Sequence, residues 1–159
     1  STLNRAKETA EIIADKIGKP IETSNLFIEQ RRPREQIGKP KDDQEVLHIE
    51  KTIRENFHIK NFRFSDEETF SDLKNRAKQA LYFLKNRPEE NILVVTHGFF
   101  MRIIMAHAVF GDKLTGYECE RLLRAFSMEN TGITILKFDY KKVDSSWLLW
   151  TWNDHAHLG

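Results

Sequence analysis

The sequence predicts an α/β fold of three layers, in which helices cover both faces of a mixed, mostly parallel sheet. The segment 91–96 is a nearly continuous run of apolar, mainly β-branched residues, which is typical of a strand buried on both faces. Segments with helical periodicity lie on either side of this run, and two further strand-like segments end the chain. The 159 residues fit one domain, 1–159.

The first helix is expected to begin at a cap formed by Ser1 or Thr2 and to end at Gly18, because apolar residues recur at helical spacing between these points. Residues 20–28 then have a short extended pattern. Residues 29–41 are rich in proline, glycine and charged side chains, which predicts a loop.

Two helices follow this loop. Asp42 or Asp43 can cap the first of them, whose apolar residues run from 46 to 57. Ser65 and Glu68 have the spacing of a capping box ahead of the most strongly periodic helix of the chain, and Pro88 ends that helix.

After the buried strand, the pattern predicts helices over 99–110 and 117–126. The last two strands are expected at 132–138 and 146–153, joined by a polar turn at 139–144. Strands that alternate with helices and end in a hairpin indicate a mixed sheet.

Composition excludes several classes of protein. The 25 Lys and Arg residues against 24 Asp and Glu give a net charge of +1, which offers no electrostatic basis for bulk nucleic-acid binding. No segment reaches the roughly 18 apolar residues of a membrane span, so no membrane partner is expected. Because Cys119 is the single cysteine, the chain has no internal disulfide, and a reducing, cytoplasmic setting is expected.

His97 and Gly98 occupy the most informative position, between the expected buried strand and the helix that follows it. Ligands of open α/β sheets bind at the carboxyl ends of strands, and a helix N-terminus there offers free N–H groups to an anion such as phosphate. His97 can donate a hydrogen bond to a phosphate oxygen. The alternative is a histidine that only completes the core.

Three more charged side chains are candidates for the same site. Arg5, in the first turn of the first helix, can bind two phosphate oxygens with one guanidinium. Glu29 ends an apolar stretch, where partial burial would make it a usable general acid. Arg31 belongs to a basic loop that can act as a lid toward an acidic substrate. Taken singly, each of the three is better explained as a solvated surface side chain.

Together these segments resemble the histidine phosphatase superfamily, also called phosphoglycerate-mutase-like. Ser1–Ala10 is similar to the family's S-x-L-x-R-A-x-x-T-A helix start, residues 26–29 to the segment with the proton-donating Glu, and Val94–Gly98 to the second histidine motif. The resemblance implies that Arg5 and His97 bind the phosphoryl group and that Glu29 is the acid and base. It implies hydrolysis of a phosphorylated small molecule through a phosphohistidine, without metal or other cofactor.

The sequence departs from this family in one large respect, because it contains no Arg-His-Gly motif to supply the nucleophilic histidine. We therefore expect a domain that is incomplete at its N-terminus, lacks an internal strand of the sheet and is inactive alone. The open sheet edge should pair with a separate N-terminal segment or with a second copy in a homodimer.

Three alternatives remain open at this stage. The first is a phosphoglycerate mutase, although the loop 29–41 is shorter than mutases of the family usually carry. The second is a non-catalytic, anion-binding remnant that has lost the nucleophile. A metal site that combines His155 and His157 with His97 or His107 is the third alternative, because two histidines one residue apart on a strand face the same side.

Overall fold

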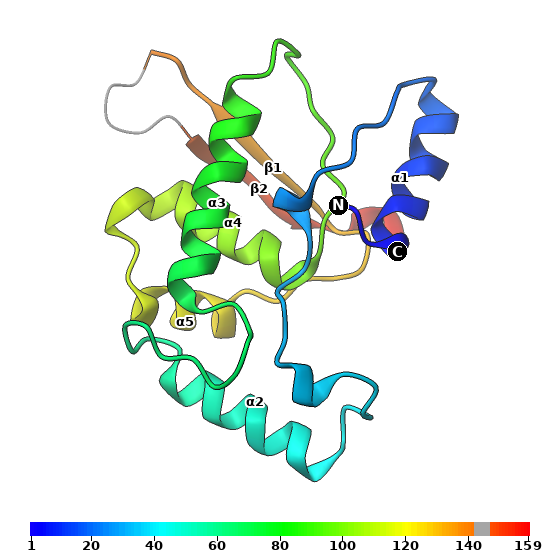
Figure 1. The fold of residues 1–159 in the computed structure, drawn as a ribbon. Coiled ribbons are helices and arrows are strands. Elements are labelled where there is room, and N and C mark those ends of the chain that lie inside the picture. Colours follow the sequence, from blue (N-terminus) through cyan, green and yellow to red (C-terminus); the bar gives the residue numbers. More distant parts are fainter. Residues whose placement is uncertain (142–146) are drawn as a thin grey trace.

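Residues 1–141 and 147–159 are described by the computed structural model of the chain (Figure 1). The helices are α1 (Asn4–Ile17), α2 (Gln44–Asn56), α3 (Phe70–Lys85), α4 (Gly98–Phe110) and α5 (Gly116–Ala125). The strands are β1 (Ile133–Phe138) and β2 (Trp147–Asp154). Short 3-10 turns are η1 (Asn25–Phe27), η2 (Arg34–Gln36), η3 (Gly111–Lys113) and η4 (Ala156–Leu158). The five predicted helices are confirmed.

The α4 helix forms the centre of the core because it is apolar on nearly all sides. It packs against α3, α5 and β2. On α3, the stripe predicted from the sequence is buried, with Leu73, Ala77 and Ala80 each 0% exposed. On α4, Phe100 and Ile103 are equally buried. A helix that is hydrophobic all round requires such cover from several neighbours.

The only sheet in the described part of the chain is the antiparallel pair of β1 and β2, whose register shifts twice between Ile133 and Leu136. The predicted mostly parallel sheet is therefore not present among these residues. Segment 91–96 is not a strand, and its Ile92 and Leu93 are 41% and 64% exposed, so the prediction of burial on both faces is wrong. No described strand is hydrogen-bonded to it to form a ladder.

Two of the predicted helix starts are wrong in detail. The capping box of α3 is formed by Thr69 and Asp72, not by Ser65 and Glu68. The N-cap of α1 is Leu3, with no side-chain cap, because the Ser1 hydroxyl accepts a hydrogen bond from the Leu3 N–H outside the helix. The prediction for α2 is confirmed.

In α2, the cap is Asp43, whose carboxylate accepts from the N–H groups of Glu45 and Val46. The final hairpin is also confirmed as two strands. The expected turn 139–144 and the expected first residue of the last strand, Ser146, lie partly or wholly outside the described residues.

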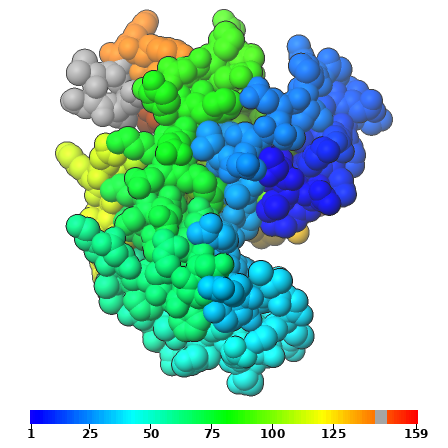
Figure 2. Space-filling view, viewed as in Figure 1, coloured from blue at the N-terminus to red at the C-terminus, as the bar shows by residue number. Residues whose placement is uncertain are grey.

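Helix α1 stands apart from the rest of the molecule. Only Ala6 of this helix is buried, whereas Ile12 and Ile17 are 66% and 56% exposed. Figure 2 shows α1 at the right of the visible face and α2 at the bottom, with an indentation between them. None of the described helices is both long and apolar enough to cross a membrane.

Candidate active site

His97 lies at the start of α4 as its N-cap residue and is 6% exposed. Its Nε2 atom lies 2.9 Å from the hydroxyl of Ser1, whose ammonium group donates to the carbonyl of Val95 at 3.2 Å. Burial lowers the pKa of His97, and the positive charge of Arg5 lowers it further, whereas the Glu29 carboxylate opposes this shift. Near neutral pH, His97 is therefore held in its neutral form.

Glu29 supplies the cap that the His97 side chain does not. Its Oε1 atom accepts hydrogen bonds from the N–H of Phe100 at 3.1 Å and from the N–H of Gln30 at 3.0 Å. A carboxylate is stabilised at a helix N-terminus because unpaired N–H groups and the helix dipole are both positive there. Glu29 and His97 are thus brought to the same end of the same helix.

The start of α4 retains further capacity for an anion. In the part of the chain that the structure describes, the N–H groups of Gly98 and Phe99 have no hydrogen-bond partner. Gly98 is exposed, and a Cβ atom built on it would meet nothing within 4 Å. As predicted, a helix begins at this point, with Gly98 as its first residue. The two unpaired N–H groups suit a bound phosphoryl group.

The predicted arginines differ in their surroundings. Arg5 is exposed in the first turn of α1 and lies close enough to His97 to lower its pKa. Arg31 is bound elsewhere, because its Nε donates to the carbonyl of Asp66 at 2.7 Å and its N–H donates to Glu68 at 2.9 Å. The structure therefore relates Arg5, Glu29 and His97 electrostatically and ties Arg31 to the loop before α3.

Hydrogen bonds that the sequence did not predict hold these segments together. The hydroxyl of Thr96 donates to the carbonyl of Phe27 at 2.8 Å, and the hydroxyl of Thr2 donates to the side chain of Asn25 at 2.8 Å. Thr96 immediately precedes His97, and Thr2 lies in the segment Ser1–Ala10 that resembles the family's helix start. Sequence spacing alone does not reveal hydrogen bonds between positions so far apart. These bonds join the start of α1, η1 and the segment leading into α4.

Each of the two C-terminal histidines has a hydrogen-bond partner in the protein. Nδ1 of His155 lies 2.8 Å from the carbonyl of Asn153, and Nε2 of His157 lies 3.1 Å from the hydroxyl of Thr131. Across residues 1–141 and 147–159, no group of three or more possible metal ligands is assembled. The metal alternative gains no support from this arrangement.

Comparison with known proteins identifies the fold. The sequence profile of the histidine phosphatase superfamily (branch 1) matches residues 1–154. The solved structure of YhfR from Bacillus stearothermophilus is similar to the chain with a TM-score of 0.72 at 24% sequence identity. The superposition covers 100% of this chain and 74% of that one. No curated protein matches the chain.

Proposed function

The chain belongs to the histidine phosphatase superfamily (branch 1), and we propose that it forms part of a site that hydrolyses phosphomonoesters. The observation that carries the proposal is the start of α4, where His97, Glu29 and two unpaired N–H groups converge beside the charge of Arg5. A phosphoryl dianion is the ligand that this combination of donors and positive charge favours.

In the proposed reaction, Arg5 binds two of the phosphoryl oxygens, and the N–H groups of Gly98 and Phe99 bind the third. His97 donates a hydrogen bond to the same group and stabilises the charge that develops in the transition state. Glu29 takes up a proton when the phosphoryl dianion is bound, gives it to the leaving alcohol and then takes another from the water that releases phosphate. The bond to phosphorus is made and broken by a nucleophilic histidine, as the family resemblance implies.

That nucleophile is proposed to come from a segment other than the described ones. The sequence has no Arg-His-Gly motif, and segment 91–96 exposes Ile92 and Leu93 and is not paired with a described strand. A strand paired with 91–96 would complete the mixed sheet of a three-layer fold and would end next to His97. A second copy of the chain that shares this edge is the alternative partner.

The absence of the motif from the sequence also favours a second candidate function. A domain that keeps Arg5 and His97 without a nucleophile would bind a phosphorylated ligand but would not hydrolyse it. Mutase activity on phosphoglycerate is less favoured, because the loop 29–41 is shorter than mutases of the family usually carry.

The test combines binding with turnover. Binding of inorganic phosphate is measured by calorimetry for the 159-residue chain and for Arg5→Gln and His97→Gln, with Arg121→Gln as a control on the exposed face of α5. We expect the first two variants to weaken binding at least tenfold and the control to leave it unchanged. Equal binding by all four proteins would overturn the assignment of the site.

Hydrolysis of p-nitrophenyl phosphate is then assayed for this chain and for a longer polypeptide that carries an Arg-His-Gly segment ahead of Ser1. We expect turnover only with the longer polypeptide. Turnover by the 159-residue chain that His97→Ala abolishes would refute the proposal that the nucleophile lies elsewhere. Phosphate binding without turnover in either form would favour the non-catalytic candidate.

A further inference from the structure

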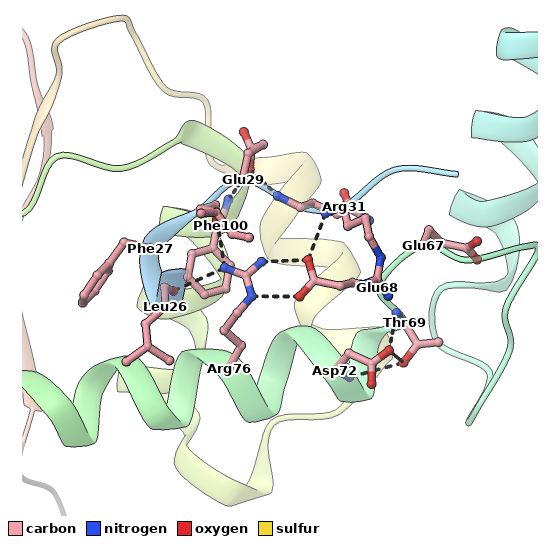
Figure 3. A network of polar contacts seen from close by, with 12 residues as sticks. Leu26, Phe27, Glu29, Arg31, Glu67, Glu68, Thr69, Asp72, Arg76 and Phe100 are labelled. Carbon is pink, nitrogen blue, oxygen red and sulfur yellow. Dashed lines mark hydrogen bonds and ion pairs between the residues drawn. The ribbon is translucent and has the colours of Figure 1, made fainter. Parts of the chain in front are cut away.

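Arg76 of α3 forms a two-pronged ion pair with Glu68 (Figure 3). Its Nε and Nη2 atoms each lie 2.8 Å from a carboxylate oxygen of Glu68. The two side chains are each only 12% exposed. Because a bidentate pair of this kind is largely shielded from water, it fixes the guanidinium in one orientation.

The remaining nitrogen of Arg76 binds the segment that leads to Glu29. Its Nη1 atom donates to the carbonyl of Ile28 at 2.8 Å and to that of Leu26 at 3.3 Å. The guanidinium carbon lies 3.5 Å from the centroid of the Phe100 ring, so the plane of the group is also in contact with α4. One side chain therefore joins α3, η1 and α4.

These contacts reach Glu29 from two directions. Ile28 is the residue immediately before Glu29, and its carbonyl is held by Arg76. Phe100 supplies the ring beneath Arg76, and its own N–H donates to the Glu29 carboxylate at 3.1 Å. Figure 3 shows the Arg76 guanidinium against the Phe100 ring, with Glu29 above Phe100 in this view.

Glu68 completes the arrangement on the other side of Glu29 in the chain. Its Oε2 atom accepts from the N–H of Arg31 at 2.9 Å, and its own N–H donates to the carbonyl of Arg31 at 3.1 Å. The backbone is therefore fixed both one residue before Glu29 and two residues after it.

We propose that Arg76, together with Glu68, is a positioning residue that holds the Glu29 carboxylate in place relative to His97. This inference rests on the proposed function, because it assigns Glu29 and His97 to one reacting site. Arg76 acts through Glu29 and its neighbours and does not itself bind the phosphoryl group.

Stability alone explains this pair poorly. Well-packed apolar residues often replace a buried ion pair with no loss of stability, because removing two charges from water is costly. A guanidinium differs from apolar packing in that its donors lie in a fixed plane, so several carbonyl and carboxylate groups are held in one geometry. The Arg76–Glu68 pair therefore contributes a precise position of the groups that it binds.

The test uses the pKa of His97 as a measure of its interaction with Glu29, read by NMR titration of the histidine ring. Because the Glu29 carboxylate raises the pKa of His97, Glu29→Gln is expected to lower it. The same substitution is then made in an Arg76→Lys background. Lysine keeps the positive charge, which itself acts on His97, but loses the planar fork.

If Arg76 positions Glu29, the fall in the pKa of His97 caused by Glu29→Gln shrinks to less than half in the Arg76→Lys background. An equal fall in both backgrounds overturns the proposal. Arg63→Lys is the matched control, because Arg63 also binds near the start of α3, through the Glu67 carbonyl and the Asp72 carboxylate. It is expected to leave the fall unchanged.

The outcome is independent of turnover. If Arg76→Lys does not fold, as judged by circular dichroism, the pair of titrations is repeated with Glu68→Gln, and an equal fall there overturns the proposal as well. Binding of inorganic phosphate is measured on the same samples. Loss of the coupling in a protein that does not bind phosphate would support the positioning role and refute the proposed function.

Discussion

Glu29 is expected to stabilise the fold as well as to take part in the site, because its carboxylate caps α4. Glu29→Ala removes the acceptor of the hydrogen bonds from Phe100 and Gln30, at 3.1 and 3.0 Å. Loss of a helix cap costs about 0.5–2 kcal/mol of unfolding free energy, and hydrogen bonds to charged groups lie toward the upper part of this range. We therefore expect a loss of about 1–2 kcal/mol.

For a domain of this size, 1 kcal/mol corresponds to about 2–4 °C in Tm, so Glu29→Ala should lower Tm by about 2–8 °C. Glu29→Gln keeps an acceptor oxygen and loses only the charge at the helix N-terminus, which is worth about 0.3–1 kcal/mol. Its Tm should lie between those of the parent protein and Glu29→Ala.

Thermal unfolding followed by circular dichroism at pH 7 measures the three proteins. Glu22→Ala is the control, because this exposed glutamate makes only a surface ion pair with Arg87, and its effect should stay within about 0.5 kcal/mol. A Tm for Glu29→Ala equal to or above that of the parent would refute the capping role, and it would indicate a carboxylate held under strain.

Three further predictions concern pH, reactivity and packing. Burial lowers the pKa of His107 below its ordinary value of 6.5. The unfolded chain therefore binds the proton at a higher pH than the folded chain does, and the free energy of unfolding falls as pH drops below about 6.5. Urea titrations between pH 8 and 5 should show a smaller decrease in this free energy for His107→Leu than for the parent protein. Burial raises the pKa of the Cys119 thiol to about 12, so a thiol reagent should modify the native protein at least a hundredfold more slowly than the protein in 6 M guanidinium, and equal rates would contradict its burial. A Cβ on Gly116 would lie 2.7 Å from the backbone of His58, so Gly116→Ala should cost about 1–3 kcal/mol in chemical denaturation, whereas Gly98→Ala, with open space, should leave the core intact.

The helices could be predicted because their signals are local. The stripe of Leu73, Ala77 and Ala80 repeats at helical spacing, and Asp43 precedes an apolar run as a cap does. Capping boxes were harder to place, since Ser65 and Thr69 both precede an acidic residue by three positions. Only the tertiary structure selects Thr69.

The conformation of segment 91–96 could not be predicted, because a strand needs a neighbour. Its composition favours a buried strand, yet Leu93 is 64% exposed where no described strand covers it. Hydrophobic pattern reports what a segment would bury if a partner were present, and it carries no information on whether that partner lies within the same sequence.

The candidate site was predictable in its residues more than in its contacts. His97 and Glu29 were found from their positions at the ends of apolar runs. Arg76 was missed, although an arginine three residues after Leu73 and four before Ala80 lies beside the buried stripe and requires a partner there. Which group meets it depends on contacts between positions about fifty residues apart, such as Arg76 and Leu26.

Helix α4 has a consequence for how this sequence can evolve. Its first turn presents the N–H groups of the candidate site, and the same helix places Phe100, Ile103 and Ala106, each 0% exposed, in the core. Selection for chemistry and selection for packing therefore act on the same thirteen residues. Few substitutions should be tolerated in α4 and many in α2, where only Val46 and Ile49 are buried.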